Sequence, residues 1–336
     1  MNIDFKHYQS AHCENGVTTS LLRHYGYDFM TEPLAFGLGS GLFYIHIPFF
    51  KINNGPGISF RTMPGAIFKR TCRSLGIKVA HKKFSNPQKA AEFLDHQLYN
   101  NIPVGCQVGV FNLTYFPADY RFHFNAHNLI VFGKENSCYS ISDPVMETAT
   151  QLSAEELERV RFAKGAFAPK GHIYYPYSIP KPNLELLRKG IVKGIKRNSR
   201  DMLYVPGGIA GVNGIKYTAK QIRKWPSKLG ERRAALNLGQ IIRMQEEIGT
   251  GGGGFRFIYA AFLEQSANIL QNDKLLSSSE DFTKAGDMWR AAAVEMAAAY
   301  KNRITGVDGY NRIGNMLDEI SEQEKTAFTK LSKMKL

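Results

Sequence analysis

Residues 126–144 (AHNLIVFGKENSCYSISDP) constrain the fold more than any other segment, because they predict two strands joined by a tight turn. The apolar run at 129–132 suits a buried strand, and residues 133–136 have the composition of a turn. A second strand follows at 138–141 and ends at an Asp-Pro pair. The segment therefore predicts an antiparallel hairpin.

A hairpin centred on Glu135 places a histidine and an aspartate opposite each other. His127 lies eight residues before this centre, and Asp143 lies eight residues after it. Directly opposed residues of an antiparallel pair share a face, with side chains about 5 Å apart. The carboxylate can then hold one imidazole nitrogen while the other nitrogen faces a third group. A register slip of one residue would put the two side chains on opposite faces.

Cys13 is the predicted third group. It opens a predicted helix that stops at Gly26, so its thiol lies near the positive end of the helix dipole, which favours the thiolate. Backbone amides of the first turn can bind a developing oxyanion. This chain order is that of papain-like enzymes, with Cys13 as nucleophile, His127 as base and Asp143 as the group that orients the histidine. The alternative is structural: a small buried cysteine and a histidine satisfied in the core.

A side-chain donor for the oxyanion is expected just before the cysteine. Gln9, four residues upstream, is the natural amide, and His7, six residues upstream, and His12 are alternatives. In papain-like peptidases a glutamine typically holds the place that His7 has here. The other interpretation of Gln9 is a solvated loop residue.

The chain is predicted to be α+β with two domains, since 336 residues are long enough for both. Residues 1–150 mix helices and strands and predict a papain-like catalytic domain. Residues 151–336 predict a mainly helical accessory domain. The predicted helices of this second domain cover 183–199, 216–248, 255–271, 279–302 and 310–333. The change of domain is placed near 148–180, where YYPYSIPKP has the character of an extended linker.

Composition narrows the classes of protein. A hydrophobic fraction of 43% and a charged fraction of 21% are those of a soluble globular protein. The sequence has no apolar run long enough to span a membrane and no secretory signal at its start, so a cytoplasmic location is expected. The four cysteines show no metal-ligand spacing and suit a reducing compartment. No metal site is predicted, and Cys72, Cys106 and Cys138 are expected to be inert core thiols.

A net charge of +14 favours acidic partners. Nucleic acid, an anionic membrane surface and an acidic carrier protein all qualify, but no nucleic-acid-binding signature is present. Basic residues gather at 187–200 and 216–233, which form a candidate docking surface or simply solvated helix faces. Met288, Trp289, Met296 and Tyr300 recur at helical spacing, which predicts packing within the domain or across a homodimer.

Four glycines at 251–254 precede a predicted helix that contains Arg256. The amides of Gly252 and Gly253, with the Arg256 guanidinium, form a candidate site for a phosphate or a substrate carboxylate. The pattern is neither a Walker loop nor a dinucleotide fingerprint. The alternative is a turn for close helix packing, with Arg256 paired to Glu264 or another acid.

Three segments of the first half (HCENGVTTSLLRHYG, AFGLGSGLFY and AHNLIVFGKENSCYSISDP) resemble the N-terminal domain of the butirosin-biosynthesis protein H (BtrH) family. Two others (GVNGIKYTAKQIRKWP and GTGGGGFRFIYAAFLEQSA) are similar to the helical domain that accompanies it in many bacterial proteins. The resemblance implies a papain-like acyltransferase of secondary metabolism, with Cys13, His127 and Asp143 as its triad. Cys13 would take an acyl group from a phosphopantetheine thioester on an acyl carrier protein and pass it to an amine.

The expected partners are thus an acidic acyl carrier protein and a small amine, with a carrier-bound or CoA-type thioester as co-substrate and no tightly bound cofactor. Two rival functions remain open. The first is a peptidase or amidase that uses the same triad with water as acceptor. The second is a non-catalytic module that binds a carrier protein or a ligand and keeps the papain-like shell.

Overall fold

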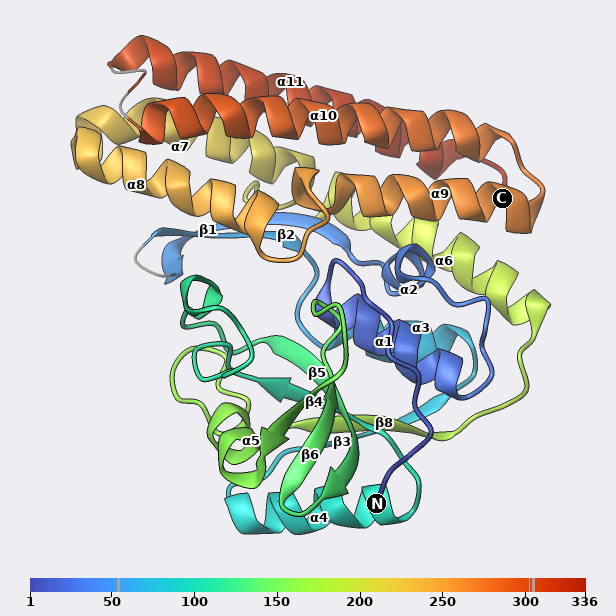
Figure 1. Cartoon of the computed structure of the whole chain (residues 1–336). Helices are drawn as coiled ribbons and strands as arrows, with labels where there is room; N and C mark the ends of the chain where they lie inside the picture. The colour runs from blue at the N-terminus through green and yellow to red at the C-terminus, as the bar shows by residue number, and fades with distance from the viewer. Residues whose placement is uncertain (53–54, 302, 304–305) are drawn as a thin grey trace. The chain divides into compact units, whose positions relative to one another are not determined.

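The computed structural model describes residues 1–52, 55–301, 303 and 306–336 (Figure 1). The chain divides into two compact units. The first consists of Met1–Ala35 and Ile67–Leu186, and the second of Phe36–Ala66 and Leu187–Leu336. The predicted α+β class is confirmed, because the first unit contains a sheet with helices and the second is mainly helical.

An antiparallel sheet of six strands organises the first unit, in the order β3-β8-β4-β5-β6-β7 (Figure 1). Its strands are β3 (Lys78–Lys82), β4 (Val104–Val108), β5 (His127–Glu135), β6 (Cys138–Ser142), β7 (Thr150–Ser153) and β8 (Ile173–Ser178). The helices are α1 (Cys13–His24), the first turn of α2 (Glu32–Leu38), α3 (Ala66–Ser74), α4 (Pro87–Tyr99) and α5 (Ala154–Arg161).

The core of this unit follows alternate residues of the central strands. Cys106 of β4 lies opposite Leu129 of β5, and both are fully buried. Two residues along, Val108 lies opposite His127, so the histidine continues the apolar row at the end of the sheet. Burial raises the pKa of the Cys106 thiol to about 11 and also raises that of Cys72, which fits the prediction of inert core thiols for these two. Cys138, the third cysteine of that prediction, is only partly buried.

The β5–β6 hairpin differs in register from the prediction. Its turn consists of Asn136 and Ser137, whose φ values of 45° and 70° are those of the primed two-residue turns that suit twisted hairpins. The hairpin is therefore not centred on Glu135. The predicted direct opposition of His127 and Asp143 is wrong, because the true register offsets them along the strands.

A β-bulge nevertheless keeps these two residues on one face. The pairing advances two residues along β5, from Val131 to Gly133, for one residue along β6, so Phe132 is the extra residue. Without the bulge, the register would place His127 and Asp143 on opposite faces of the sheet. With it, the two are diagonal neighbours, whose side chains remain within reach of each other.

The segment YYPYSIPKP, predicted as a linker, contains strand β8 instead. The strand pairs with β3 along its length, and Ile173 and Tyr174 also pair with β4. Pro176, which has no N–H to donate, lies beyond the stretch that pairs with β4. Because β7, α5 and β8 belong to the sheet unit, the compact units do not divide at the predicted residue 150.

Six α-helices and one hairpin form most of the second unit within the described residues (Figure 1). The hairpin joins β1 (Leu42–Ile52) to β2 (Gly55–Arg61). The helices are α6 (Leu184–Tyr204), α7 (Gly211–Leu229), α8 (Glu231–Ile242), α9 (Arg256–Leu270), α10 (Lys274–Tyr300) and α11 (Val307–Lys333). The predicted helix over 216–248 is in fact two, because Gly230 adopts a positive φ of 76° between α7 and α8.

The packing prediction is confirmed for Trp289 and Met296, which are fully buried, but not for Tyr300, which is 45% exposed. Met288 is partly buried. Asn302, the last residue of the predicted helix over 279–302, lies outside the described residues. None of the helices formed by the described residues combines the length and the hydropathy needed to cross a bilayer.

Candidate active site

Cys13 is the first residue of α1, as predicted, and only 6% of its surface is exposed. The imidazole of His12 caps this helix, since its Nδ1 accepts a hydrogen bond from the backbone N–H of Asn15. The Glu32 carboxylate accepts hydrogen bonds from the backbone N–H groups of Ala11 (3.0 Å) and His12 (2.7 Å). These contacts fix the backbone that leads into the cysteine.

Two further contacts hold the first turn of α1. The buried Glu14 carboxylate accepts hydrogen bonds from the backbone N–H groups of Ile67 (2.9 Å) and Phe68 (3.3 Å), at the start of α3. Gly16 lies so close to Pro144 that a Cβ at this position would be 2.3 Å from the proline Cβ. The missing side chain therefore lets α1 approach the end of β6, where Asp143 lies.

His127 and Asp143 form a buried hydrogen-bonded pair. Nε2 of His127 and Oδ2 of Asp143 are 2.7 Å apart, and the residues are 5% and 0% exposed. Oδ2 also accepts a hydrogen bond from the hydroxyl of Tyr115 at 2.7 Å, and Oδ1 accepts one from the backbone N–H of Val145 at 3.2 Å. Three donors thus satisfy this buried carboxylate.

Because Asp143 occupies Nε2, Nδ1 is the imidazole nitrogen left for Cys13. Burial by itself lowers the pKa of His127. The charges of Asp143 and of the Cys13 thiolate, with hydrogen bonds to both, outweigh burial and raise this pKa to about 10. The structure thus brings the three predicted side chains together within the first unit, in an environment that favours the protonated imidazolium form of His127.

Two residues of this site were not predicted. Tyr115 comes from the long connection between β4 and β5, whose aromatic side chains gave no sign of a contact with Asp143. Asn128 follows His127 in β5, and its Nδ2 lies 3.8 Å from the Cys13 Sγ. Both contacts join segments distant in sequence, and the adjacency of Asn128 to His127 was the one available signal.

Two family models match the chain. The N-terminal domain of butirosin biosynthesis protein H matches residues 12–144, a range that contains Cys13, His127 and Asp143. A domain of unknown function, DUF4872, matches residues 155–331, which is more than half of the chain. The chain belongs to the BtrH-like family.

Among solved structures, this BtrH-like chain is similar to a protein described as a C39-like peptidase from Bacillus anthracis. The two are 13% identical with a TM-score of 0.38, and the match covers 53% of this chain and 96% of the other. A likeness this slight carries no argument about activity. No curated protein matches the chain.

The two predicted oxyanion donors of this BtrH-like chain, His7 and Gln9, lie in different environments. Both ring nitrogens of His7 are engaged, Nδ1 with the Ser142 hydroxyl at 2.8 Å and Nε2 with the carbonyl of Met146 at 3.1 Å. His7 therefore holds the end of β6 and has no ring nitrogen left for an oxyanion. Gln9 is exposed to solvent.

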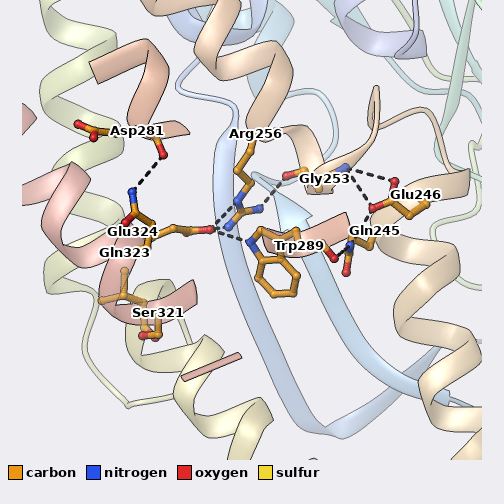
Figure 2. A network of polar contacts seen from close by, with 11 residues as sticks. Gln245, Glu246, Gly253, Arg256, Asp281, Trp289, Ser321, Gln323 and Glu324 are labelled. Carbon is orange, nitrogen blue, oxygen red and sulfur yellow. Dashed lines mark hydrogen bonds and ion pairs between the residues drawn. The ribbon is translucent and has the colours of Figure 1, made fainter. Parts of the chain in front are cut away.

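Gly252, Gly253 and Arg256 lie in the second unit, where internal acids occupy the predicted anion site (Figure 2). The backbone N–H of Gly253 donates to the Glu246 carboxylate, and that of Gly252 donates to the Thr250 hydroxyl. This corrects the prediction of a ligand site, because the amides already have partners within the chain.

The Arg256 guanidinium is likewise occupied (Figure 2). It is fully buried and forms a two-pronged ion pair with Glu324, at 2.8 and 2.9 Å, and Glu324 also accepts a hydrogen bond from the indole of Trp289. Arg256 donates further to the carbonyl of Gly254. The alternative interpretation, a packing turn with Arg256 paired to an acid, therefore describes this network, and the acid is Glu324.

Replacing Arg256 tests the structural role. Arg256→Met leaves the Glu324 carboxylate buried without its cation, so the free energy of unfolding should fall by about 3–5 kcal/mol. The matched control Arg312→Met breaks an exposed ion pair with Glu295 and should cost less than about 1 kcal/mol. Urea unfolding measures both, and unchanged stability of Arg256→Met would contradict the structural role.

Proposed function

We propose that this BtrH-like chain is a papain-like cysteine acyltransferase that moves an acyl group from a thioester to an amine. The observation that supports this proposal is the buried contact of Cys13 with a His127 that Asp143 orients and charges. The thioester is proposed to be carried by the phosphopantetheine of an acyl carrier protein, in line with the biosynthetic role in the name of the matched family.

The proposed reaction has two halves. In the first, the Cys13 thiolate attacks the thioester carbonyl, the carbon–sulfur bond to phosphopantetheine breaks, and the departing thiolate takes the proton from Nδ1 of His127. In the second, the amine attacks the acyl-enzyme, His127 takes its proton, and Cys13 leaves as a thiolate. Asp143 keeps the imidazole oriented and stabilises its charged form throughout.

The reacting side chains of the proposed transferase are buried. The cysteine and the histidine are 6% and 5% exposed, so bulk water has little access to an acyl group on Cys13. A peptidase or amidase would form the same acyl-enzyme and differ in its acceptor. The proposed chemistry needs no metal or resident cofactor, and the four free cysteines suit a cytoplasmic setting.

Intact-mass measurement with an acyl thioester of N-acetylcysteamine tests the proposed activity. We expect wild type to gain one acyl group and to lose it faster when an amine is added than in water alone. Cys13→Ser should acylate at least about 10³-fold more slowly, since the nucleophile is gone. Cys138→Ser, which removes another free thiol, serves as the control. A wild-type thiol that is alkylated but never acylated would refute the acyltransferase, and equal loss to water would favour the hydrolase.

A basic groove on α6 is the proposed docking site for the carrier protein. The groove has a volume of about 730 Å³ within the second unit. The residues that line it are Arg188, Lys189, Val192, Lys193, Lys196, Arg197, Arg200, Leu270 and Leu336. The cations at 189, 193, 196 and 200 recur every three or four residues and so follow one face of the helix. Arg197 and Arg200 pair with Asp201, and on α7 Lys216 and Arg223 pair with acids of α11. The α6 groove is therefore proposed for the number of cations that it gathers on one face.

Charge reversal on α6 tests this surface. Lys193→Glu with Lys196→Glu should raise the KM for a carrier-bound thioester by about tenfold or more, because two attractive contacts become repulsive. The KM for the N-acetylcysteamine thioester should not change. The control, Lys284→Glu with Lys325→Glu, makes the same charge change elsewhere on the second unit. Equal KM values for the carrier-bound substrate in both variants would rule out docking on α6.

A further inference from the structure

Asn128 places a buried amide against the nucleophile. Successive residues of a strand point to opposite faces, so Asn128 and His127 leave β5 in opposite directions. The Nδ2 of Asn128 lies 3.8 Å from the Cys13 Sγ, and the residue is only 4% exposed. The thiol therefore has two neighbours from β5, the imidazole of His127 and the amide donor of Asn128.

The orientation of this amide is determined by its other contacts. Nδ2 lies 3.1 Å from the backbone carbonyl of Ala126, which only accepts hydrogen bonds, so the NH₂ group must be on that side. Oδ1 accepts a hydrogen bond from the hydroxyl of Tyr174 at 2.8 Å. One N–H of Asn128 is thus used by Ala126, and the second is directed toward Cys13.

Tyr174 is itself held in place by the sheet. It lies in β8 opposite Gly105 of β4, and a Cβ at Gly105 would come within 2.4 Å of the tyrosine ring. The ring is buried and packs against Phe68, with 4.7 Å between the ring centroids. The glycine leaves the space that the phenol needs to reach Asn128.

We infer that Asn128 is the side-chain oxyanion donor of this site and that Tyr174 positions it. The inference rests on the proposed acyl transfer. When the Cys13 sulfur bonds to the thioester carbon, the carbonyl π electrons move to its oxygen, which becomes an oxyanion attached to the carbon beside Sγ. A donor aimed at Sγ lies within reach of that oxygen, whereas His7 is fully engaged and Gln9 is exposed.

Two reactions of the same thiol separate an oxyanion donor from a merely structural residue. Acylation by a thioester passes through an oxyanion, but alkylation by iodoacetamide does not. Asn128→Ala should therefore slow Cys13 acylation by about 10²–10³-fold while alkylation changes little. Tyr174→Phe keeps the ring and removes the hydroxyl, and should slow acylation by about fivefold. Gln9→Ala should reduce the rate of Cys13 acylation less than Asn128→Ala does.

Acylation of Asn128→Ala at the wild-type rate would overturn the inference, as would an equal loss of acylation and alkylation. If Asn128→Ala does not fold, judged by circular dichroism, Tyr174→Phe decides on the same two rates. Failure of wild type to acylate would refute the proposed function and the inference with it, whereas acylation of wild type with no selective loss in the variants refutes the inference alone.

Discussion

The hydrogen bond between His127 and Asp143 determines how the rest of the site is built, because both groups are buried. A buried carboxylate left without its partner costs roughly 3–5 kcal/mol, so each member of the pair requires the other. The Tyr115 hydroxyl and the backbone N–H of Val145 donate the other hydrogen bonds to the Asp143 carboxylate. The carboxylate is thereby fixed, and it keeps the imidazole in one orientation. Asp143 and Cys13 together raise the pKa of the imidazole, which favours its charged form beside the sulfur.

The thiol reaches this pair because two acids and a glycine fix the start of α1. Glu32 holds the loop before Cys13, and Glu14 ties the first turn of the helix to α3. Gly16 allows the helix to contact Pro144, the residue after Asp143. These residues need not touch a substrate, yet their contacts set the position of the sulfur, which is where small displacements cost most in catalysis.

Local chemistry made part of this arrangement predictable. The helix that begins at Cys13 is confirmed, as is its stop before Gly26, whose φ of 85° suits a residue without a side chain. The register of His127 with Asp143 was wrong in detail, because neither the turn at 136–137 nor the bulge at Phe132 has a distinct local signal. The contact of Tyr115 with Asp143 joins segments that are distant in sequence, so local patterns do not encode it. Strand β8 contains a proline and forms only because it pairs with neighbouring strands, which local patterns do not encode either.

The proposed mechanism needs an imidazolium beside a thiolate, so the charge state of His127 is its sharpest test. A ¹³C–¹H NMR titration of the ring, assigned by its loss in His127→Gln, measures this state. Because the pKa is raised to about 10, the ring should remain protonated at pH 8. In Asp143→Asn the largest raising charge is lost and burial opposes protonation, so the midpoint should fall. A wild-type ring that is neutral at pH 7 would contradict the account.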